Sequence, residues 1–392
     1  MNPVICSIAR TPIGRFSGDF APLSAMDLGG TAIQGALDRA GLDPDQVDEV
    51  LFGHVIQAGQ GQITARQAAV NAGIPMTVPA TTINKVCLSG LTAIQEAANH
   101  VRLKESTFVV AGGMESMTNA PYLLPDARSG LRMGDRTIVD SLTHDGLFCA
   151  FDTCMMGESS DLRNEQLDIN RATQDAWSAE SHARALKATE SGAFAEEIIP
   201  VEVRQRRRDP IVVTRDGGIR PGTTTESLGK LRPAFASSGT ITAGNASQIS
   251  DGAAAVVVAN RAAAEAAGLP IVAEIVAYGQ IAGPDATLHE RPAQALNVAL
   301  KRASLEIDDI DLFEINEAFA SVAMWSTQML GIDHAKVNVH GGAVALGHPL
   351  GATGARIVVT LINALRTTGG SLGGAALCGG GGQGDALIVR MV

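Results

Sequence analysis

The feature that most constrains this chain is an internal repeat. Segment 40–48 (AGLDPDQVD) resembles segment 303–311 (ASLEIDDID), an offset of 263 residues from Ala40 to Ala303, and each copy runs into an apolar, strand-like stretch. Two further matches follow in the same order: 110–113 (VAGG) with 377–380 (LCGG), and 251–258 with 384–389. Three matches in one order favour a duplication. We therefore expect two similar halves that divide near residue 265.

Both halves have the pattern of an α/β protein. Segments 3–8, 109–113 and 253–259 are built of valine, isoleucine and small residues, as buried strands are, and 88–103 is typical of a helix. The first half carries extra, more charged material. We therefore predict an N-terminal half at 1–117 plus 244–265, an inserted loop domain at 118–243, and a C-terminal half at 266–392. For the basic run 204–208 (RQRRR) a solvated turn is the favoured interpretation, and a phosphate contact is the alternative.

Composition narrows the classes of function. The net charge of −11 argues against a nucleic-acid partner. No apolar stretch is long enough for a membrane helix, and no basic segment followed by an apolar one marks a secretory signal. The five cysteines form no CxxC pair and no Cys/His cluster with metal-ligand spacing. We therefore expect a cytoplasmic protein with reduced thiols and no metal or other cofactor.

Four short segments carry groups suited to covalent chemistry. Cys87 lies between a strand-like run and a helix, where the helix dipole favours a thiolate, and Cys378 precedes the bare backbone of 379–382. His348 lies between Gly347 and Pro349, and Asn316 follows a strand-like run. Each has an inert interpretation, since lone cysteines are usually buried fillers and a turn histidine often binds only backbone. Together they indicate a thiol nucleophile with acid–base partners.

These segments resemble, in order, the four signature blocks of the thiolase family: 84–90 (NKVCLSG), 316–320 (NEAFA), 347–349 (GHP) and 378–380 (CGG). The resemblance covers essentially the whole chain and is strongest to the bacterial acetyl-CoA acetyltransferases of that family. It implies the thiolase fold, in which duplicated βαβαβαββ halves form five layers, α-β-α-β-α, with an inserted loop domain that holds coenzyme A.

The resemblance also implies roles for the matched residues. Cys87 would accept the acyl group, His348 would activate it, and Cys378 would move the proton of the substrate α-carbon. Asn316, through a water, and His348 would form one oxyanion hole, and the backbone N–H groups of Cys87 and Gly380 the other. The expected reaction joins two acetyl-CoA into acetoacetyl-CoA and CoA, so coenzyme A is substrate and product, not a cofactor.

Further positions match family binding residues. Those matching CoA contacts are Arg220, Ser227, Phe235, Ala243 and Ser247, and those expected beside the acyl chain are Leu147, Met155, Met156, Leu288 and Phe319. Segment 125–140 resembles the loop through which family members form tetramers, so a homotetramer, a dimer of dimers, is expected. Fatty acid metabolism is the expected setting.

Three departures from the family pattern bear on acyl preference. Met155 stands where acetyl-specific members usually have His, His340 where Asn is usual, and 288–292 (LHERP) where a Gly-rich stretch is usual. The nearest alternative is therefore a broader-range 3-ketoacyl-CoA thiolase of fatty-acid or side-chain breakdown. A decarboxylating ketoacyl synthase would need His at 378, and an inactive CoA-binding relative would lack one of the two cysteines.

Overall fold

The structure is a computed structural model that describes residues 3–205 and 208–392. Its core is one sheet in the order β14-β15-β16-β13-β1-β12-β5-β3-β4. The strands of the first half are β1 (Pro3–Arg10), β3 (Glu49–Gly53), β4 (Ala80–Ile83), β5 (Phe108–Ser116) and β12 (Ser250–Asn260), with the short β2 (Gly14–Arg15) on β12. Those of the second half are β13 (Ala273–Ala282), β14 (Leu312–Ile315), β15 (Leu372–Gly379) and β16 (Gln383–Met391).

The two halves meet at a narrow seam. β1 and β13 share only two Cα pairs, Val4 with Glu274 and Ile5 with Ala273. On either side of this seam the strands repeat one order, because β14, β15, β16 and β13 correspond to β3, β5, β12 and β1. The counterpart of β4 is reduced to a single bridge between Phe313 and Val337. The sheet is therefore two duplicated sheets joined at one edge.

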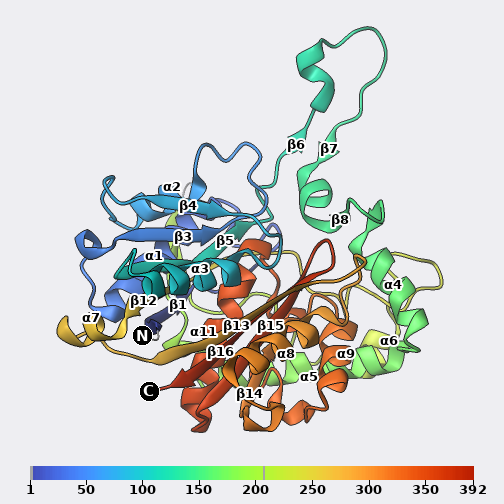
Figure 1. Ribbon diagram of the computed structural model, residues 1–392. Coiled ribbons are helices and arrows are strands. Elements are labelled where there is room, and N and C mark those ends of the chain that lie inside the picture. The colour runs from blue at the N-terminus through green and yellow to red at the C-terminus, as the bar shows by residue number, and fades with distance from the viewer. Residues whose placement is uncertain (1–2, 206–207) are drawn as a thin grey trace.

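Helices separate and cover the two sheets (Figure 1). Those of the first half are α1 (Ala25–Ala40), α2 (Thr64–Asn71) and α3 (Ser89–Leu103), and those of the second are α8 (Arg291–Ala303), α9 (Ala320–Leu330), α10 (Ala343–Leu346) and α11 (Leu350–Thr368). The apolar residues of α3 and α11 form one buried cluster with both sheets, whereas α1 and α2 pack on the first sheet alone and α8 and α9 on the second alone. The layers therefore run α-β-α-β-α, as expected.

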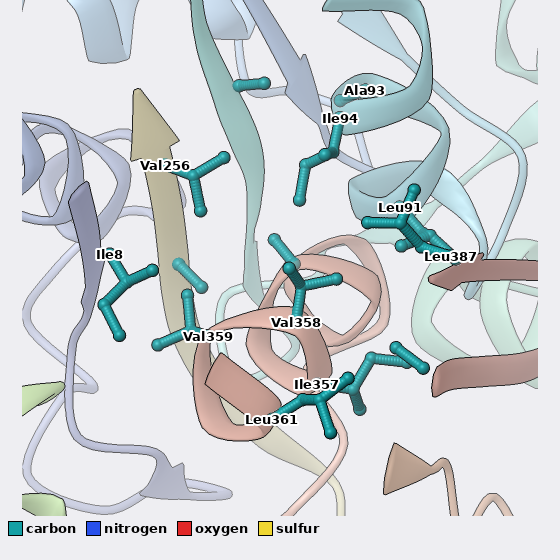
Figure 2. Packing of buried hydrophobic residues seen from close by; sticks show 14 of the residues in the cluster. Ile8, Leu91, Ala93, Ile94, Val256, Ile357, Val358, Val359, Leu361 and Leu387 are labelled. Atoms are coloured by element: carbon teal, nitrogen blue, oxygen red, sulfur yellow. The ribbon is translucent and has the colours of Figure 1, made fainter. Parts of the chain in front are cut away.

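The middle layer holds the largest core. Figure 2 shows Ile8 of β1, Val256 of β12, and Val358 and Val359 of α11 in this cluster, together with Leu91 of α3 and Leu387 of β16. Three glycines permit this close packing. A Cβ on Gly90 would lie 2.8 Å from the nitrogen of Ala355, one on Gly354 would lie 2.3 Å from the nitrogen of Leu91, and one on Gly113 would lie 1.9 Å from the oxygen of Gly351. Any side chain at these three positions would push apart the elements that meet at the junction of the halves.

The repeat seen in the sequence is also a structural repeat. Helices α1 and α8 both end in a left-handed residue, Gly41 (φ 67°) and Ser304 (φ 55°). Asp48 and Asp311, at equivalent places before β3 and β14, each accept two backbone N–H bonds from the start of the neighbouring strand, β5 or β15. The same local sequence therefore builds the same helix-to-strand turn twice.

One of the three sequence matches has the wrong register. Glu49 pairs with Val109 on β5, and its counterpart Leu312 pairs with Gly373 on β15. The structural counterpart of Val110 is therefore Gly374 and not Leu377. The glycines of VAGG and LCGG coincide in composition but lie at different heights in the two sheets, because small residues are needed at different contacts.

The chain between β5 and β12 makes no strand of the main sheet. It contains β6 (Tyr122–Leu123), β7 (Val139–Asp140), β8 (Phe148–Cys149), β9 (Cys154–Met155), α4 (Met156–Gln166), α5 (Arg171–Glu190), β10 (Val201–Gln205), β11 (Arg208–Val213) and α6 (Thr225–Gly229), with short helical turns at Pro125–Ser129, Leu142–Leu147 and Ala193–Glu196. The β6–β7 segment projects from the body (Figure 1). Residues 206–207 of the basic run lie outside the described residues, so the predicted turn there stays a prediction, and Arg204 before them is exposed. No helix in the described part could cross a membrane.

Four remaining short helical elements complete the described chain: α7 (Arg261–Ala266) between the two halves, and the turns Pro44–Gln46, Ile307–Asp309 and His334–Lys336.

Candidate active site

Cys87 lies in the turn between β4 and α3, two residues before the helix begins at Ser89. Val86 has φ 50°, a left-handed conformation that is rare for a β-branched residue. The Ser89 hydroxyl donates to the oxygen of Val86 (2.6 Å) and accepts from the N–H of Lys85 (2.8 Å), and Asn84 Oδ1 accepts from the N–H of Val86 (3.1 Å). These bonds maintain a strained turn that presents the thiol at the junction of the halves.

His348 occupies the matching place in the second half, two residues before α11 begins at Leu350. Its Nε2 lies 3.2 Å from the sulfur of Cys87, although 261 residues separate the two in sequence. Its Nδ1 lies 2.7 Å from Oγ1 of Thr353. The Thr353 hydroxyl donates to the carbonyl oxygen of Pro349 (2.9 Å), so it can only accept from Nδ1–H. This leaves Nε2 unprotonated and able to accept the thiol proton.

Burial makes this pair neutral at rest. Burial raises the pKa of Cys87 to about 12. The backbone N–H groups of Cys87 and Gly380 point at the sulfur and have the opposite, smaller effect on that pKa. Glu115 adds a smaller increase to the pKa of Cys87. Burial likewise lowers the pKa of His348 to about 3, with a further contribution from the positive charge of Arg356. A thiol and a neutral imidazole in contact can exchange a proton as a bond forms at sulfur.

Cys378 lies near the end of β15 and is buried to 1% exposure. Burial raises the pKa of its thiol well above the usual range, and Cys87 is the second cause, so the two sulfurs are electrostatic neighbours. Gly380, just beyond β15, is close enough to Val86 that a Cβ there would lie 3.4 Å from its side chain. The end of β15 therefore packs directly against the Cys87 turn, as the sequence motifs require.

Asn316 follows β14 directly and is fully buried, and its N–H bonds to Ala376 of β15 (2.9 Å). Neither its Oδ1 nor its Nδ2 has a hydrogen-bond partner among the described residues. A buried amide needs partners, so this side chain is suited to hold a water or a ligand oxygen. The carboxylate of its neighbour Glu317 accepts hydrogen bonds from the side chains of Trp177, Ser181 and Asn338 and from the N–H of Val344. Glu317 therefore has a structural role, because it holds the segment that leads to His348.

The acyl-side residues form two groups. Leu288 and Phe319 share one buried apolar cluster with Cys378, and Met156 packs against it. Leu147 packs instead against the central cluster that contains Cys87. Met155 belongs to neither; it pairs with Phe148 across the β8–β9 ribbon and directly precedes α4. The structure thus brings Leu288, Phe319 and Met156 together with Cys378, and it leaves Met155 outside this cluster.

The expected CoA residues lie mostly on the surface. Arg220, Ser227 and Ala243 are exposed, and Ser227 already caps α6 through Thr224. Phe235, 37% exposed, closes over Gly157 and meets Phe319 edge to face at 6.1 Å. The N–H of Ser247 bonds to the oxygen of Ala318 (3.1 Å). Phe235 and Ser247 therefore connect the exposed set to the Cys378 cluster.

Of the departures from the family pattern, His340 and His289 lie outside the apolar clusters that contain the two cysteines. His340 packs edge to face on Phe194 at 5.8 Å, in a part of the core that contains neither cysteine. His289 is fully buried, with Nε2 2.8 Å from Asn164 Oδ1 and 3.1 Å from Ser321 Oγ. Within the departing segment 288–292, Leu288 is the residue that belongs to the Cys378 cluster.

Several functional residues were not identified from the sequence. Thr353 contacts His348, Val86 shapes the Cys87 turn, and Glu115 raises the pKa of Cys87 through its charge. Thr353 and Val86 lie close in sequence to the motif residues, and that proximity is the signal that could have suggested them. No group of three or more His, Cys, Asp or Glu side chains within the described residues could hold a metal ion.

Two buried thiols, an imidazole in contact with one of them, and a pair of converging backbone N–H groups at the junction of duplicated halves define a centre for covalent thiol chemistry. Comparison with known proteins identifies the family. The chain matches the family model "Thiolase, N-terminal domain" over residues 3–262 and "Thiolase, C-terminal domain" over 269–391.

Similar proteins agree with this assignment. A "Probable acetyl-CoA acetyltransferase" of Mycolicibacterium smegmatis is 51% identical over 99% of this chain and 100% of its own length. An "Acetyl-CoA acetyltransferase" of Pseudomonas aeruginosa is 46% identical over 98% of each chain. The crystal structure of the Bacillus anthracis acetyl-CoA acetyltransferase superposes with a TM-score of 0.96 at 40% identity, covering 100% of this chain and 99% of that one. The chain belongs to the thiolase family, has the thiolase fold, and is an acyltransferase.

Proposed function

We propose that this enzyme is an acetyl-CoA C-acetyltransferase that reversibly condenses two acetyl-CoA into acetoacetyl-CoA and CoA through an acetyl–Cys87 intermediate. The observation that carries the proposal is the 3.2 Å contact between His348 Nε2 and the sulfur of Cys87, with Cys378 as a second buried thiol beside it. The printed names of the relatives support the acetyl specificity.

In the first half-reaction the Cys87 proton passes to Nε2 of His348 as sulfur bonds to the thioester carbon of acetyl-CoA. The N–H groups of Cys87 and Gly380, which converge on the sulfur, would stabilise the oxygen that gains charge. The bond to CoA sulfur then breaks, His348 returns the proton to that sulfur, and CoA leaves. Acetyl–Cys87 and neutral His348 remain.

In the second half-reaction His348 takes the proton of Cys378, and the resulting thiolate removes a proton from the α-carbon of a second acetyl-CoA. The carbanion bonds to the acetyl carbon on Cys87, and the Cys87 thiolate leaves and recovers the proton from His348. Asn316, whose buried amide lacks partners, would hold a water against the enolate oxygen together with His348. Cys87, His348 and Cys378 all return to their starting states.

The remaining assignments are also proposals. Arg220, Ser227, Ala243 and Ser247, with Phe235 as the link to the pocket, would bind CoA. Residues 118–243 would form the loop domain. The projecting β6–β7 segment carries exposed apolar side chains, among them Leu131 (57%) and Met133 (101%), as a tetramer contact would need. Cytoplasmic location and a role in fatty acid metabolism are proposed on the sequence alone.

A broader-range 3-ketoacyl-CoA thiolase is the second candidate. It is favoured by the apolar walls around Cys378, since Leu288, Phe319 and Met156 offer no polar group to reject a longer chain. A Staphylococcus epidermidis relative named "Probable acetyl-CoA acyltransferase", 45% identical over 98% of each chain, is consistent with a wider range.

Intact-mass analysis after incubation with acetyl-CoA alone tests the proposal. We expect one acetyl group on the wild-type chain, located at Cys87, and none on Cys87→Ala. The buried, distant Cys6 provides the matched control, since Cys6→Ala should still be acetylated. An acetyl group on Cys6, Cys149 or Cys154 would refute the assignment. Turnover of 3-ketoacyl-CoAs of rising length then separates the two candidates.

A further inference from the structure

An ion pair next to the nucleophile has no place in the mechanism above. Lys85 lies two residues before Cys87, and its Nζ bonds to both carboxylate oxygens of Asp385, at 2.7 and 2.9 Å. The Thr92 hydroxyl donates to Oδ2 of the same carboxylate at 2.8 Å. The Asp385 side chain is fully buried and that of Lys85 is 21% exposed.

The ion pair joins the two halves at the reacting groups. Lys85 belongs to the loop that carries Cys87 and leads into α3. Thr92 lies in the first helical turn of α3. Asp385 is on β16, where its neighbour Gly384 pairs with Cys378 and Asp385 itself pairs with Leu377. A single carboxylate therefore ties the strand pair that carries Cys378 to the loop that carries Cys87.

Stability is a poor explanation for such a pair. The cost of desolvating two charges offsets most of their attraction, so buried ion pairs add little to folding, whereas they do restrict geometry. The geometry in question is demanding, because Val86 holds a left-handed φ of 50° between Lys85 and Cys87. The bonds of Ser89 and Asn84 fix this turn only within the first half. Lys85 is the residue of the turn that reaches a charged group of the second half.

We propose that Lys85 and Asp385, with Thr92, are positioning residues that set the separation of the Cys87 and Cys378 sulfurs. The proposal rests on the proposed function. Acylation of Cys87 needs the contact with His348, which lies just before α11, and also uses the N–H of Gly380, which lies just beyond β15. Carbon–carbon bond formation needs Cys87 and Cys378 themselves at the right separation. Because the contact with His348 does not run through β15 or β16, loss of the ion pair should impair the second half-reaction more than the first.

The experiment measures both half-reactions on Asp385→Asn, Lys85→Met and the double variant. Acetylation of Cys87 by acetyl-CoA is followed by rapid-quench mass analysis, and thiolysis of acetoacetyl-CoA by steady-state kinetics. Errors of about 1 Å in a site can cost about 100-fold in rate. We expect kcat for thiolysis to fall about 10- to 100-fold in each single variant, with the acetylation rate falling by a smaller factor and KM for CoA changed less than about threefold. The double variant should be no slower than the worse single one.

Two controls separate positioning from folding. Lys85→Arg keeps the ion pair and should restore most of kcat. Asp216→Asn removes a buried carboxylate that binds Arg10 at 2.7 Å outside the site, and should lower the melting temperature with normal kcat per folded molecule. Normal kcat in folded Asp385→Asn and Lys85→Met, equal losses in both half-reactions, or losses that multiply in the double variant would overturn the proposal. Absence of acetyl–Cys87 in the wild type would instead refute the proposed function.

Discussion

The two halves share one frame and divide the chemistry unequally. The turn before α3 presents Cys87, and the equivalent turn before α11 presents His348, each two residues before its helix. β15 carries Cys378 opposite Gly384, whereas β5 carries Met114 opposite Ala253 at the corresponding height. The first half thus supplies the proposed nucleophile, and the second supplies His348, Cys378 and Asn316.

The difference shows what duplication contributed. Repeating the fold brought two helix-initiating turns to one junction, whereas either half alone would have one such turn there. Divergence then placed Cys87 in one turn and His348 in the other. A site divided in this way depends on the relative position of the two halves, so substitutions on either side of the junction should affect it.

The largest effect should come from Cys378 on the second half. Cys378→Ala should still accept an acetyl group on Cys87 but lose condensation and thiolysis by about 10²–10⁴-fold, the usual contribution of a general acid or base. Mass analysis and turnover on the same sample test this, with Cys149→Ala as the control. If the variant cannot be acetylated, Cys378 acts in the first half-reaction and the division of roles is wrong.

Acid and alkali should destabilise the halves differently. Burial lowers the pKa of His348 to about 3 and those of His182 and His289 to about 4, so below pH 6.5 the unfolded chain binds protons that the folded chain does not. Stability should then fall by several kcal/mol between about pH 6.5 and 4. Burial raises the pKa values of Cys6 and Cys87 to about 12, so stability should also fall as pH rises above 9.

The midpoints of urea unfolding, measured across pH, test both the loss of stability in acid and the loss in alkali. His289→Gln should reduce the loss of stability in acid and leave the loss in alkali unchanged, and Cys6→Ala should do the reverse. A loss of stability in acid that is unchanged in His289→Gln would show that this histidine is protonated in the folded state.

Thr353 should matter because it orients the base of the second half. Thr353→Val removes the acceptor for Nδ1–H of His348 at nearly constant volume, and should lower kcat about 10-fold, in the range typical for the loss of a partner that orients a histidine. The effect should appear in Cys87 acetylation as well as in turnover. Thr353→Ser retains the hydroxyl and should keep most activity, and equal losses in Ser and Val would point to packing instead.

Met155 should have the smallest effect, because it lies outside the apolar cluster that contains Cys378. We expect best kcat/KM on acetoacetyl-CoA, weaker activity on C5–C6 substrates and a steep fall beyond. Met155→His should shift the preference towards acetoacetyl-CoA by a few-fold, since one fitted methylene contributes about 0.8 kcal/mol. Exposed Met76→His serves as the control. Activity that rises steadily to C10 would favour the broader thiolase, and an unchanged profile would remove residue 155 from specificity.

The sequence alone determined the frame and the types of reacting group. The repeat at 40–48 and 303–311 predicted two halves because local patterns specify helix ends and strand starts directly, as the paired turns at Gly41 and Ser304 confirm. The expected helix at 88–103 and the strands at 3–8, 109–113 and 253–259 are present, with boundaries shifted by a few residues. The motif resemblance selected Cys87, His348, Cys378 and Asn316 without any distance between them.

Only the tertiary structure decided how these groups meet. The contact between Cys87 and His348 joins residues 261 apart, and that between Lys85 and Asp385 joins residues 300 apart, so no local propensity encodes either. The left-handed Val86 runs against its own preference and is maintained by surrounding contacts. The register that makes Gly374 and not Leu377 the counterpart of Val110 depends on strand pairing. The two long-range contacts are fixed by packing between the halves, because these distant segments become neighbours only when the two sheets close on α3 and α11. The register is fixed by strand pairing within each half.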